Sequence, residues 1–276
     1  MIKFSVISAP DINIEFKHYD FDAEVGHWKK QTEIYNPNIK INLFVAGDFT
    51  LLIGNSVYRP VYGDMCVMFP MELHRAHVYK RTHIEYYQLD ISPNALDFIS
   101  GGRELLDRLI SSGGEKYYRP DKNALSAIYS LFSEIEAAAK NGESPLAFAH
   151  CLRLITHISK MQKNRSDEAA TELSRLTRAV IGKIESDYTE DITLKSISLE
   201  FGASPSYLSR IFRREVGIGI HEYLTDYRIS QATKLLADHS VTDTCYLCGF
   251  SDASHFISVF RCHIGMTPKE YKTLHT

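Results

Sequence analysis

The segment SPSYLSRIFRREVG, residues 204–217, shows most clearly how this chain folds. Leu208, Ile211 and Phe212 are apolar at positions i, i+3 and i+4, which lie on one face of a helix. The opposite face carries small, polar or cationic side chains, namely Ser206, Ser209, Arg210 and Arg213. The segment therefore predicts an amphipathic helix that buries one stripe and exposes hydroxyl and guanidinium groups.

A second segment repeats this design 48 residues later. In DASHFISVFRCHIG, residues 252–265, the buried stripe consists of Phe256, Val259 and Phe260. The free face carries Ser254, Ile257, Ser258 and Arg261, with His255 and His263 nearby. Exposed arginines on ordinary helices would explain either segment alone. Two matched copies instead favour a pair of helices that each lie in a DNA groove.

Each of these helices follows a shorter helix and a glycine turn. Thr193 is the expected N-cap of a helix at Leu194–Phe201, which Gly202 ends before Ser204 and Pro205 begin the next. The second copy has the corresponding elements in Thr242–Cys248, Gly249-Phe250 and Asp252–Ile264. Helix, tight turn and a helix with a polar free face predict two helix-turn-helix motifs.

The remaining C-terminal elements complete this arrangement. Leu176–Tyr188 predicts a preceding amphipathic helix, and Thr267–Glu270 is a capping box that opens a last short helix. His221–Ala237 predicts the helix that joins the two motifs. A connecting helix of about 18 residues spans roughly 27 Å, so the recognition helices would lie about one DNA turn, roughly 34 Å, apart. A shorter spacing would require the DNA to bend toward the protein.

The chemistry of the exposed side chains assigns their expected roles. Arg210 or Arg213 could contact guanine in a bidentate manner, whereas Arg214 points to the side and suits a phosphate. The second motif has Arg261 as its permanent cation, so the first motif is expected to provide more affinity. The candidate DNA-binding residues are Ser204, Ser206, Ser209, Arg210, Arg213, Arg214, Ser254, His255, Ser258 and Arg261.

Composition restricts the class of protein. A length of 276 residues with 44% apolar residues suggests two domains. The sequence contains no run of 18 apolar residues, so we expect no membrane span. Five scattered cysteines and no secretion signal predict free thiols in the cytoplasm. The net charge is −3, and residues 171–276 hold 12 Lys/Arg against 13 Asp/Glu. DNA affinity must therefore depend on where the arginines lie.

The N-terminal third has the pattern of β-structure. Short apolar or alternating runs at Ile41–Val45, Thr50–Ile53, Val57–Pro60, Met65–Phe69 and Ile84–Ile91 are separated by glycine turns. They predict a small antiparallel barrel or sandwich. Helical periodicity then begins at Leu96–Ser111 and continues through Asp121–Lys140 and Leu146–Met161. These helices could pack entirely on the barrel or pair with a second copy of the chain.

The expected fold class is therefore α+β with two domains. We expect an effector and dimerisation domain at residues 1–162, with its helices from about 94, and a polar linker at 163–172. An all-α domain with two helix-turn-helix motifs and a joining helix should follow at 173–276.

The motifs YLSRIFRREVG and CGFSDASHFISVFRCHIGMTPKEY resemble the double helix-turn-helix domain of the AraC/XylS family of bacterial transcription regulators. The resemblance covers about the last 100 residues and implies a sequence-specific regulator, expected to be an activator that acts on RNA polymerase. The family's second motif usually has Ser-Arg where this chain has Ile257-Ser258, and a basic residue where it has Cys262. These departures imply weaker base reading by the second motif.

Residues 20 to 92 resemble part of a cupin barrel, the shape of effector domains in sugar-responsive regulators of that family. The resemblance rests on Gly63-Asp64, Phe69-Pro70, Glu72 and His74. The earlier His-x-His of metal-dependent cupins is missing, since this chain has Asn36-Pro37-Asn38 near that place, after isolated His27 and Glu33. We therefore expect no metal, no cofactor and no enzymatic activity. The candidate residues for a sugar-like or other small polar ligand are Trp28, His74, Arg75 and Tyr86.

Two groups of residues could either bind a metal ion or have an ordinary structural role. Glu72, His74, His77, His83 and Glu85 could provide ligands, but such residues more often line a barrel mouth or remain solvated. Cys245-x-x-Cys248 with Cys262-His263 has zinc-like spacing. The first two cysteines, however, are one helical turn apart, where a buried thiol packs well.

Three functions are consistent with these patterns. The first is a homodimeric DNA-binding regulator controlled by a small molecule. The second is a cupin-type metal enzyme with a DNA-binding tail, against which the missing metal motif argues. The third is a virulence or stress regulator whose barrel binds only another protein. A thermal-shift screen of small molecules distinguishes the first from the third.

The ranking of the two motifs can be tested by substitution. Arg210→Ala should weaken DNA binding more than Arg261→Ala, because the first motif has more cations to contact bases and phosphates. Mobility shifts at one fixed salt concentration measure both losses. A larger loss from Arg261→Ala would contradict the ranking.

Overall fold

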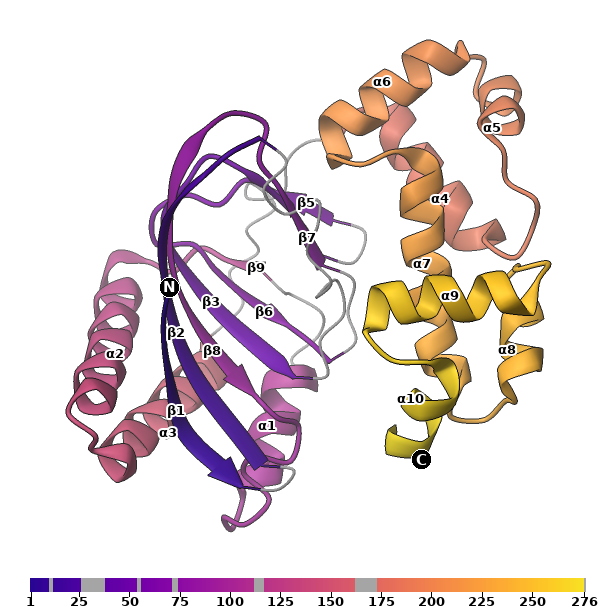
Figure 1. The fold of residues 1–276 in the computed structure, drawn as a ribbon. Helices are drawn as coiled ribbons and strands as arrows, with labels where there is room; N and C mark the ends of the chain where they lie inside the picture. Colours follow the sequence, from indigo (N-terminus) through magenta and orange to yellow (C-terminus); the bar gives the residue numbers. More distant parts are fainter. Residues whose placement is uncertain are drawn as a thin grey trace.

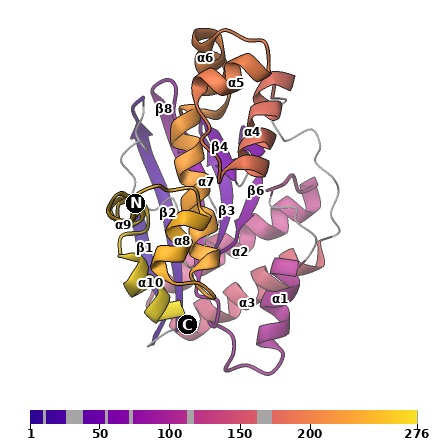
Figure 2. The ribbon, with the colours of Figure 1, turned by 90° about the vertical axis from the view of Figure 1, so that its right-hand side faces the viewer.

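The structure is a computed structural model that describes residues 1–9, 12–25, 38–53, 56–70, 74–111, 117–161 and 173–275. The N-terminal half contains two antiparallel sheets, and the C-terminal half is helical (Figures 1 and 2). The strands are β1 (Ile2–Ala9), β2 (Ile12–Ala23), β3 (Ile39–Ala46), β4 (Thr50–Ile53), β5 (Ser56–Tyr58), β6 (Met65–Met68), β7 (His74–His77), β8 (Thr82–Ile91) and β9 (Tyr117–Tyr118).

The larger sheet has the order β1-β2-β8-β3-β6-β9, and the smaller sheet has the order β5-β4-β7. Strand alternation gives each sheet two distinct faces. In β8, Tyr87, Leu89 and Ile91 belong to the core that includes α2 (Lys122–Lys140) and α3 (Ser144–Lys160). Tyr86 and Ile84, on the opposite face, belong to the core between the two sheets.

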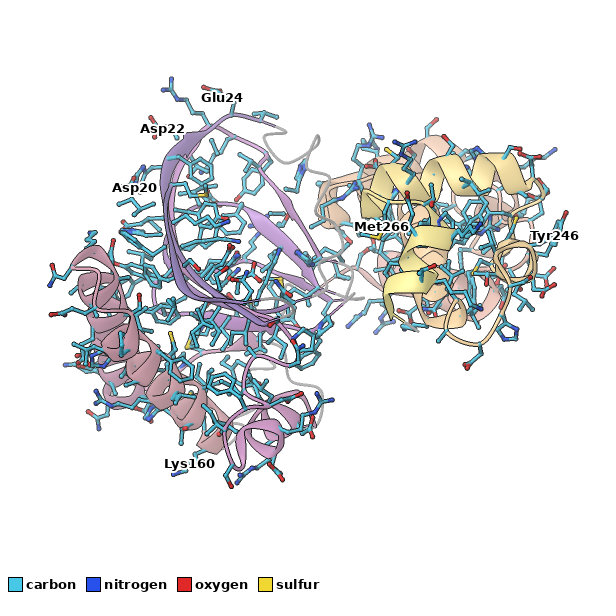
Figure 3. All side chains as sticks on the ribbon, turned by 60° about the horizontal axis from the view of Figure 1, so that its bottom comes forward. Asp20, Asp22, Glu24, Lys160, Tyr246 and Met266 are labelled. Atoms are coloured by element: carbon cyan, nitrogen blue, oxygen red, sulfur yellow. The ribbon has the colours of Figure 1, made fainter. Side chains whose placement is uncertain are left out.

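The two sheets face each other without closing into one barrel in the described part of the chain. Their strands form separate hydrogen-bonded ladders, and side chains fill the space between them (Figure 3). The α+β fold class with a sheet domain and a helical domain is therefore confirmed, with an open cupin-like arrangement in place of a closed barrel. The linker predicted at 163–172 lies outside the described residues. Leu173, the first residue of the predicted second domain, is described and buried.

Helices α2 and α3 cover the outer face of the larger sheet (Figure 1). Asp121 caps α2 by accepting hydrogen bonds from the backbone N–H groups of Asn123 and Ala124. The Phe132 ring contacts the rings of Phe16 and Tyr87, with centroid distances of 6.4 and 5.6 Å. The apolar stripes of both helices are thus largely used within one chain.

The helix expected at Leu96–Ser111 begins later, since α1 spans Gly102–Ser111 and turns precede it. Leu96 is nevertheless fully buried, and its carbonyl accepts a hydrogen bond from the N–H of Ile99. The apolar spacing across residues 96–111 therefore indicates side-chain burial both in the turns before α1 and in α1 itself.

Strand β9 was not predicted, and a buried aspartate explains its position. Asp64 is fully buried and accepts hydrogen bonds from the Tyr117 hydroxyl at 2.6 Å and from Nε and Nη2 of Arg119 at 2.8 and 2.9 Å. The backbone N–H of Val61 donates to the same carboxylate at 3.0 Å. Burial and the bond to Asp64 raise the pKa of Tyr117, so its hydroxyl remains a donor.

The C-terminal half contains the predicted helices with small shifts of their ends. These are α4 (Arg175–Asp187), α5 (Leu194–Glu200), α6 (Pro205–Val216), α7 (Ile220–Leu235), α8 (Val241–Leu247), α9 (Ala253–Ile264) and α10 (Pro268–His275). The caps expected at Thr193 and Ser204 are formed, and Thr267 and Glu270 form the predicted capping box. Among the described residues, none of the helices combines the length and apolar character that a membrane span requires.

The ion-paired anchor of β9 predicts a stability effect. Asp64→Asn should lower the stability of the N-terminal half by about 2–3 kcal/mol, because the buried Tyr117 hydroxyl and the Arg119 guanidinium lose charged acceptors. Calorimetry should show a fall in melting temperature of about 5–10 °C. Asp97→Asn is the control, since Asp97 and its partner Arg103 are exposed. Equal melting temperatures for the two variants would refute the role of Asp64.

Candidate DNA interface and polar interior

The first recognition helix, α6, presents the face that its sequence predicts. Leu208 and Phe212 are buried in the core of the C-terminal half, and Ile211 is buried beside them on the helix. Its end is set by Gly217, whose φ of +91° is in the left-handed region and whose N–H donates to the carbonyl of Arg213. The predicted DNA-binding side chains are exposed or half-buried: Ser204, Ser206, Ser209, Arg210, Arg213 and Arg214.

Tyr207 belongs to the same exposed face and was missed by the sequence analysis. Its side chain is 46% exposed, and the Arg210 guanidinium lies 5.9 Å from its ring centroid. A tyrosine among serines and arginines on a free helical face was the available signal. The ring restricts the guanidinium of Arg210 and adds a flat surface beside it.

The second recognition helix, α9, buries less of its stripe. Phe256 and Phe260 are buried, whereas Val259 is partly exposed. Asp252 caps the helix by accepting a hydrogen bond from the N–H of His255 at 2.6 Å. The predicted side chains Ser254, His255, Ser258 and Arg261 are all exposed. Exposed Tyr246 of α8 lies on the side of this half away from the sheets (Figure 3).

Helix α7 and one arginine hold the two motifs in place. Arg228 of α7 donates from Nε to the Tyr188 carbonyl and from Nη2 to the Glu190 carbonyl, both at 2.7 Å. The same guanidinium lies 5.7 Å from the ring centroid of Phe250, in the turn of the second motif. Figure 1 shows α6 beside the first end of α7 and α9 crossing α7 farther along, each with its C-terminal end toward the N-terminal half. At about 1.5 Å per residue, α7 spans roughly 24 Å.

The turn of the second motif also depends on Gly249. Its φ is +77°, and a Cβ atom there would lie 2.7 Å from the Thr189 carbonyl oxygen. Only glycine therefore permits this close approach of the second motif to the end of α4.

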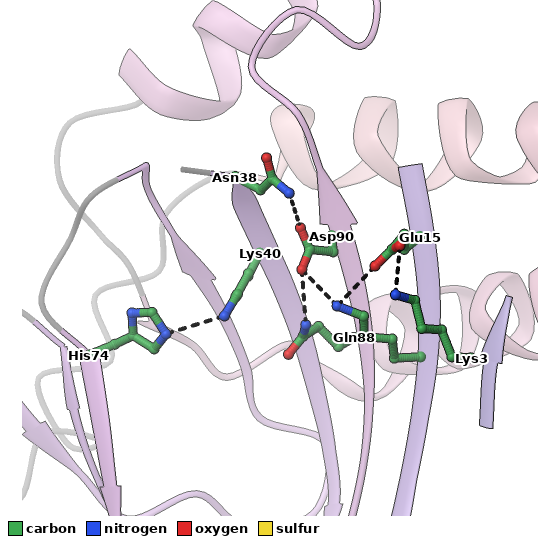
Figure 4. Close-up of polar contacts among 8 residues, drawn as sticks. Lys3, Glu15, Asn38, Lys40, His74, Gln88 and Asp90 are labelled. Atoms are coloured by element: carbon green, nitrogen blue, oxygen red, sulfur yellow. Dashed lines mark hydrogen bonds and ion pairs between the residues drawn. The ribbon is translucent and has the colours of Figure 1, made fainter. Parts of the chain in front are cut away.

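A polar cluster occupies one end of the interior face of the larger sheet (Figure 4). Lys17 lies 3.0 Å from Asp90 and 3.1 Å from Glu15. Asn38 and Gln88 donate to the same Asp90 carboxylate at 2.6 and 3.4 Å. Burial opposes the charge of Lys17, yet Asp90 and Glu15 raise its pKa to about 12. This end of the interior is thus a network of paired charges.

Lys40 and Asn42 extend this cluster along β3. They pair across the ladder with Asp90 and Gln88, so all four side chains share the interior face. The ammonium of Lys40 lies 3.4 Å from Nε2 of His74, which projects from β7 on the opposite sheet. Asn42 is 5% exposed, and its Oδ1 has no hydrogen-bond partner among the described residues. Buried acceptors without a partner are rare in stable folds, so Asn42 is a candidate for contact with a bound ligand.

The predicted ligand residues separate into two groups. His74 and Tyr86 face the interior, where Tyr86 stacks on Tyr19 at 4.4 Å. Arg75 is on the opposite face of β7 and pairs with Glu222 and Asp226 of the C-terminal half. Trp28 lies outside the described residues.

The residues of the polar cluster were not predicted, although their signal was present. Gln88 and Asp90 interrupt the apolar run of β8 at every second position, and Lys40 and Asn42 do so in β3. Alternation within a strand that is buried on both faces indicates a polar interior.

The metal-binding candidates occupy different places. Cys245 and Cys248 are buried in the helical core, whereas Cys262 is exposed. Burial raises the pKa of Cys248 to about 12, which disfavours the thiolate that zinc requires. His83 lies near Asp20 and Asp22 at the surface, and Glu72 is outside the described residues. The described part of the chain holds no group of three or more His, Cys, Asp or Glu side chains arranged for a metal ion.

Comparison with known proteins gives the same division into two parts. A model of the AraC-like ligand binding domain matches residues 32–179, and a helix-turn-helix domain matches residues 197–273. The HTH-type transcriptional activator RhaS of Citrobacter koseri is 26% identical over 183 residues, and that of Enterobacter sp. (strain 638) is 28% identical over 189 residues. Each match spans 66% of this chain and 66% of the relative's length.

Among solved structures, the C-terminal domain of AraT, a response regulator from Geobacillus stearothermophilus, is 27% identical with a TM-score of 0.37. That similarity covers 38% of this chain and 88% of the other. The ligand-binding model alone matches more than half of the chain. With its sheet half followed by two helix-turn-helix motifs, the chain belongs to the AraC family.

Proposed function

We propose that this protein is a sequence-specific DNA-binding transcription regulator that responds to a small polar molecule. The observation that supports this most directly is the pair of matched recognition helices on one connecting helix, each with an exposed polar face. The relatives named as transcriptional activators favour activation as the direction of control. An activator bound beside a promoter would contact RNA polymerase, and we place this activity in the cytoplasm.

The first motif carries most of the affinity in this proposal. Arg210, Arg213 and Arg214 are all exposed on α6, whereas α9 exposes Arg261 with the neutral Ile257 and Cys262. Arg214 lies 3.5 Å from Glu215 and remains largely exposed, which leaves it able to reach a phosphate.

The interior cluster is the proposed effector site. Lys40 and Gln88 supply donors and Asn42 supplies an unpartnered acceptor, all on one buried face. The aromatic rings of Phe44 and Tyr86, 6.1 Å apart, lie farther along the same face. This combination suits a small ligand with hydroxyl or carboxylate groups and some apolar surface. A catalytic divalent cation does not suit His74, because the Lys40 ammonium lies against its ring nitrogen.

We also propose that the protein acts as a homodimer. Tyr129 and Leu146 remain exposed on α2 and α3, although the main apolar stripes of these helices pack on the sheet. Two copies would place four recognition helices on one operator.

The salt dependence of DNA binding tests the role of Arg214. Genome-wide mapping of bound DNA would supply the target fragments. Arg214→Ala should weaken binding to all of them alike and reduce the slope of log K against log salt by about 1, because one phosphate contact is lost. Fluorescence anisotropy measures the slope, with exposed Arg103→Ala in α1 as the control. No enrichment of specific DNA would exclude the proposed function.

The effector site is tested by Asn42→Val. A thermal-shift screen of sugars, amino acids and carboxylic acids should identify a ligand that raises the melting temperature of the unaltered protein. The variant should keep its unliganded stability, because the lost acceptor has no partner in the part of the chain that the structure describes, and should lose the ligand-induced rise. Asn123→Ala, exposed on α2, is the control. A ligand that stabilises Asn42→Val equally would place the site elsewhere.

A further inference from the structure

The smaller sheet is the surface on which the C-terminal half rests. Leu52 of β4 and Val57 of β5 are buried in the hydrophobic core of the C-terminal half, not in that of the sheets. At the end of α6, a Cβ atom on Gly217 would lie 2.6 Å from the Cβ of His77 in β7. Figure 1 shows β5 and β7 on the side of the sheet domain that faces α7 and the end of α6.

Arg75 is the charged member of this interface. Its side chain is 11% exposed and reaches from β7 to α7, where Nη1 pairs with Glu222 and Nη2 lies 3.3 Å from Oδ2 of Asp226. Asp226 is fully buried, and such a carboxylate requires a nearby positive charge. The N-terminal half thus supplies a cation to a buried acid of the DNA-binding half.

The second recognition helix supplies another cation to the same acid. His263 of α9 lies with Nε2 3.0 Å from Oδ1 of Asp226 and with Nδ1 2.7 Å from the Val259 carbonyl oxygen. Both of these oxygens can only accept, so the ring satisfies both contacts when each nitrogen carries a proton. In that state the ring is an imidazolium that fastens α9 to α7.

The charges around His263 oppose one another. Burial lowers its pKa, but the hydrogen bonds to Asp226 and Val259 outweigh this effect and raise the pKa above its ordinary value. The Arg75 guanidinium acts in the opposite direction and lowers it. Among the described residues, the charged groups with the largest effect on His263 are Asp226 from α7 and Arg75 from β7, and Arg75 is itself paired with Glu222.

We propose that Arg75 and His263 compete electrostatically for Asp226. They hold different oxygens of this carboxylate at once, and the repulsion between their two positive charges means that docking of the N-terminal half loosens the attachment of the second recognition helix to α7. The coupling is reciprocal. If docking of Arg75 weakens the His263–Asp226 contact by a certain factor, formation of that contact weakens docking by the same factor. When Arg75 leaves, the contact between His263 and Asp226 would become stronger, and it would hold α9 in a fixed position before α9 binds DNA. A preorganised helix binds with a smaller loss of conformational entropy.

This inference rests on the proposed DNA-binding function for its consequence, but the competition itself can be measured without DNA. NMR titration of the His263 ring in the full chain is the first test. Arg75→Gln should raise the pKa of His263, because a repelling charge is removed, whereas Arg75→Lys should leave it close to that of the unaltered protein. Arg81→Gln is the control, because Arg81 is exposed and pairs with Asp22 and Glu24 on the sheet.

The second test measures binding to the mapped DNA fragments. Arg75→Gln should bind about fivefold to tenfold more tightly than the unaltered protein, at the lower end of the range typical of coupling between sites. The gain should disappear in the double variant Arg75→Gln/His263→Gln, in which the competing ring is absent. A melting temperature within a few degrees of the unaltered protein establishes that each variant is folded.

An unchanged His263 pKa in folded Arg75→Gln would overturn the competition. A raised pKa without tighter DNA binding, or a gain that persists without His263, would overturn its link to the recognition helix. If the unaltered protein binds no DNA at all, the proposed function fails, while the titration still decides the competition.

Discussion

The structure depends on the burial of a small sheet on both of its faces. All four residues of β4, Thr50–Ile53, are buried. Leu51 and Ile53 meet the larger sheet across the interior, and Leu52 enters the core of the helical half. A sheet of three short strands needs a hydrophobic face to pack against, and β4 packs on a neighbour at each face. The position of the DNA-binding half is therefore part of the same packing problem as the fold of the effector half.

Within the helical half, rigidity comes from contacts between segments far apart in the chain. Arg228 joins the connecting helix to the end of α4 and to the turn of the second motif. Gly249 allows that turn to touch the backbone at Thr189. The two recognition helices are thus placed by fixed backbone contacts, while the attachment of α9 also includes the titratable His263. The second motif therefore has fewer cations than the first, and its attachment to α7 depends on the protonation of His263.

Features set by local sequence were predictable, and features set by distant partners were not. The buried stripes of α6 and α9, the caps at Thr193 and Ser204 and the capping box at Thr267 follow from residues within one or two turns. Strand β7, with the sequence HRAH, has no apolar alternation and forms because β4 pairs with it. Strand β9 requires Asp64, which is 53 residues away from Tyr117. The guanidinium of Arg75 could bind a polar ligand, but Arg75 lies on the face of β7 that meets the helical half and contacts Asp226 there.

The alternation of side chains in β7 constrains how the ligand specificity of such a protein can evolve. His74 faces the polar interior, and its immediate neighbour Arg75 faces the DNA-binding half. With the effector site proposed in this polar interior, a substitution that shifts the strand to fit a new ligand also displaces the guanidinium next to it. Changes of inducer specificity and changes of basal expression should therefore arise together, and natural variants selected for one should often carry compensating substitutions on α7.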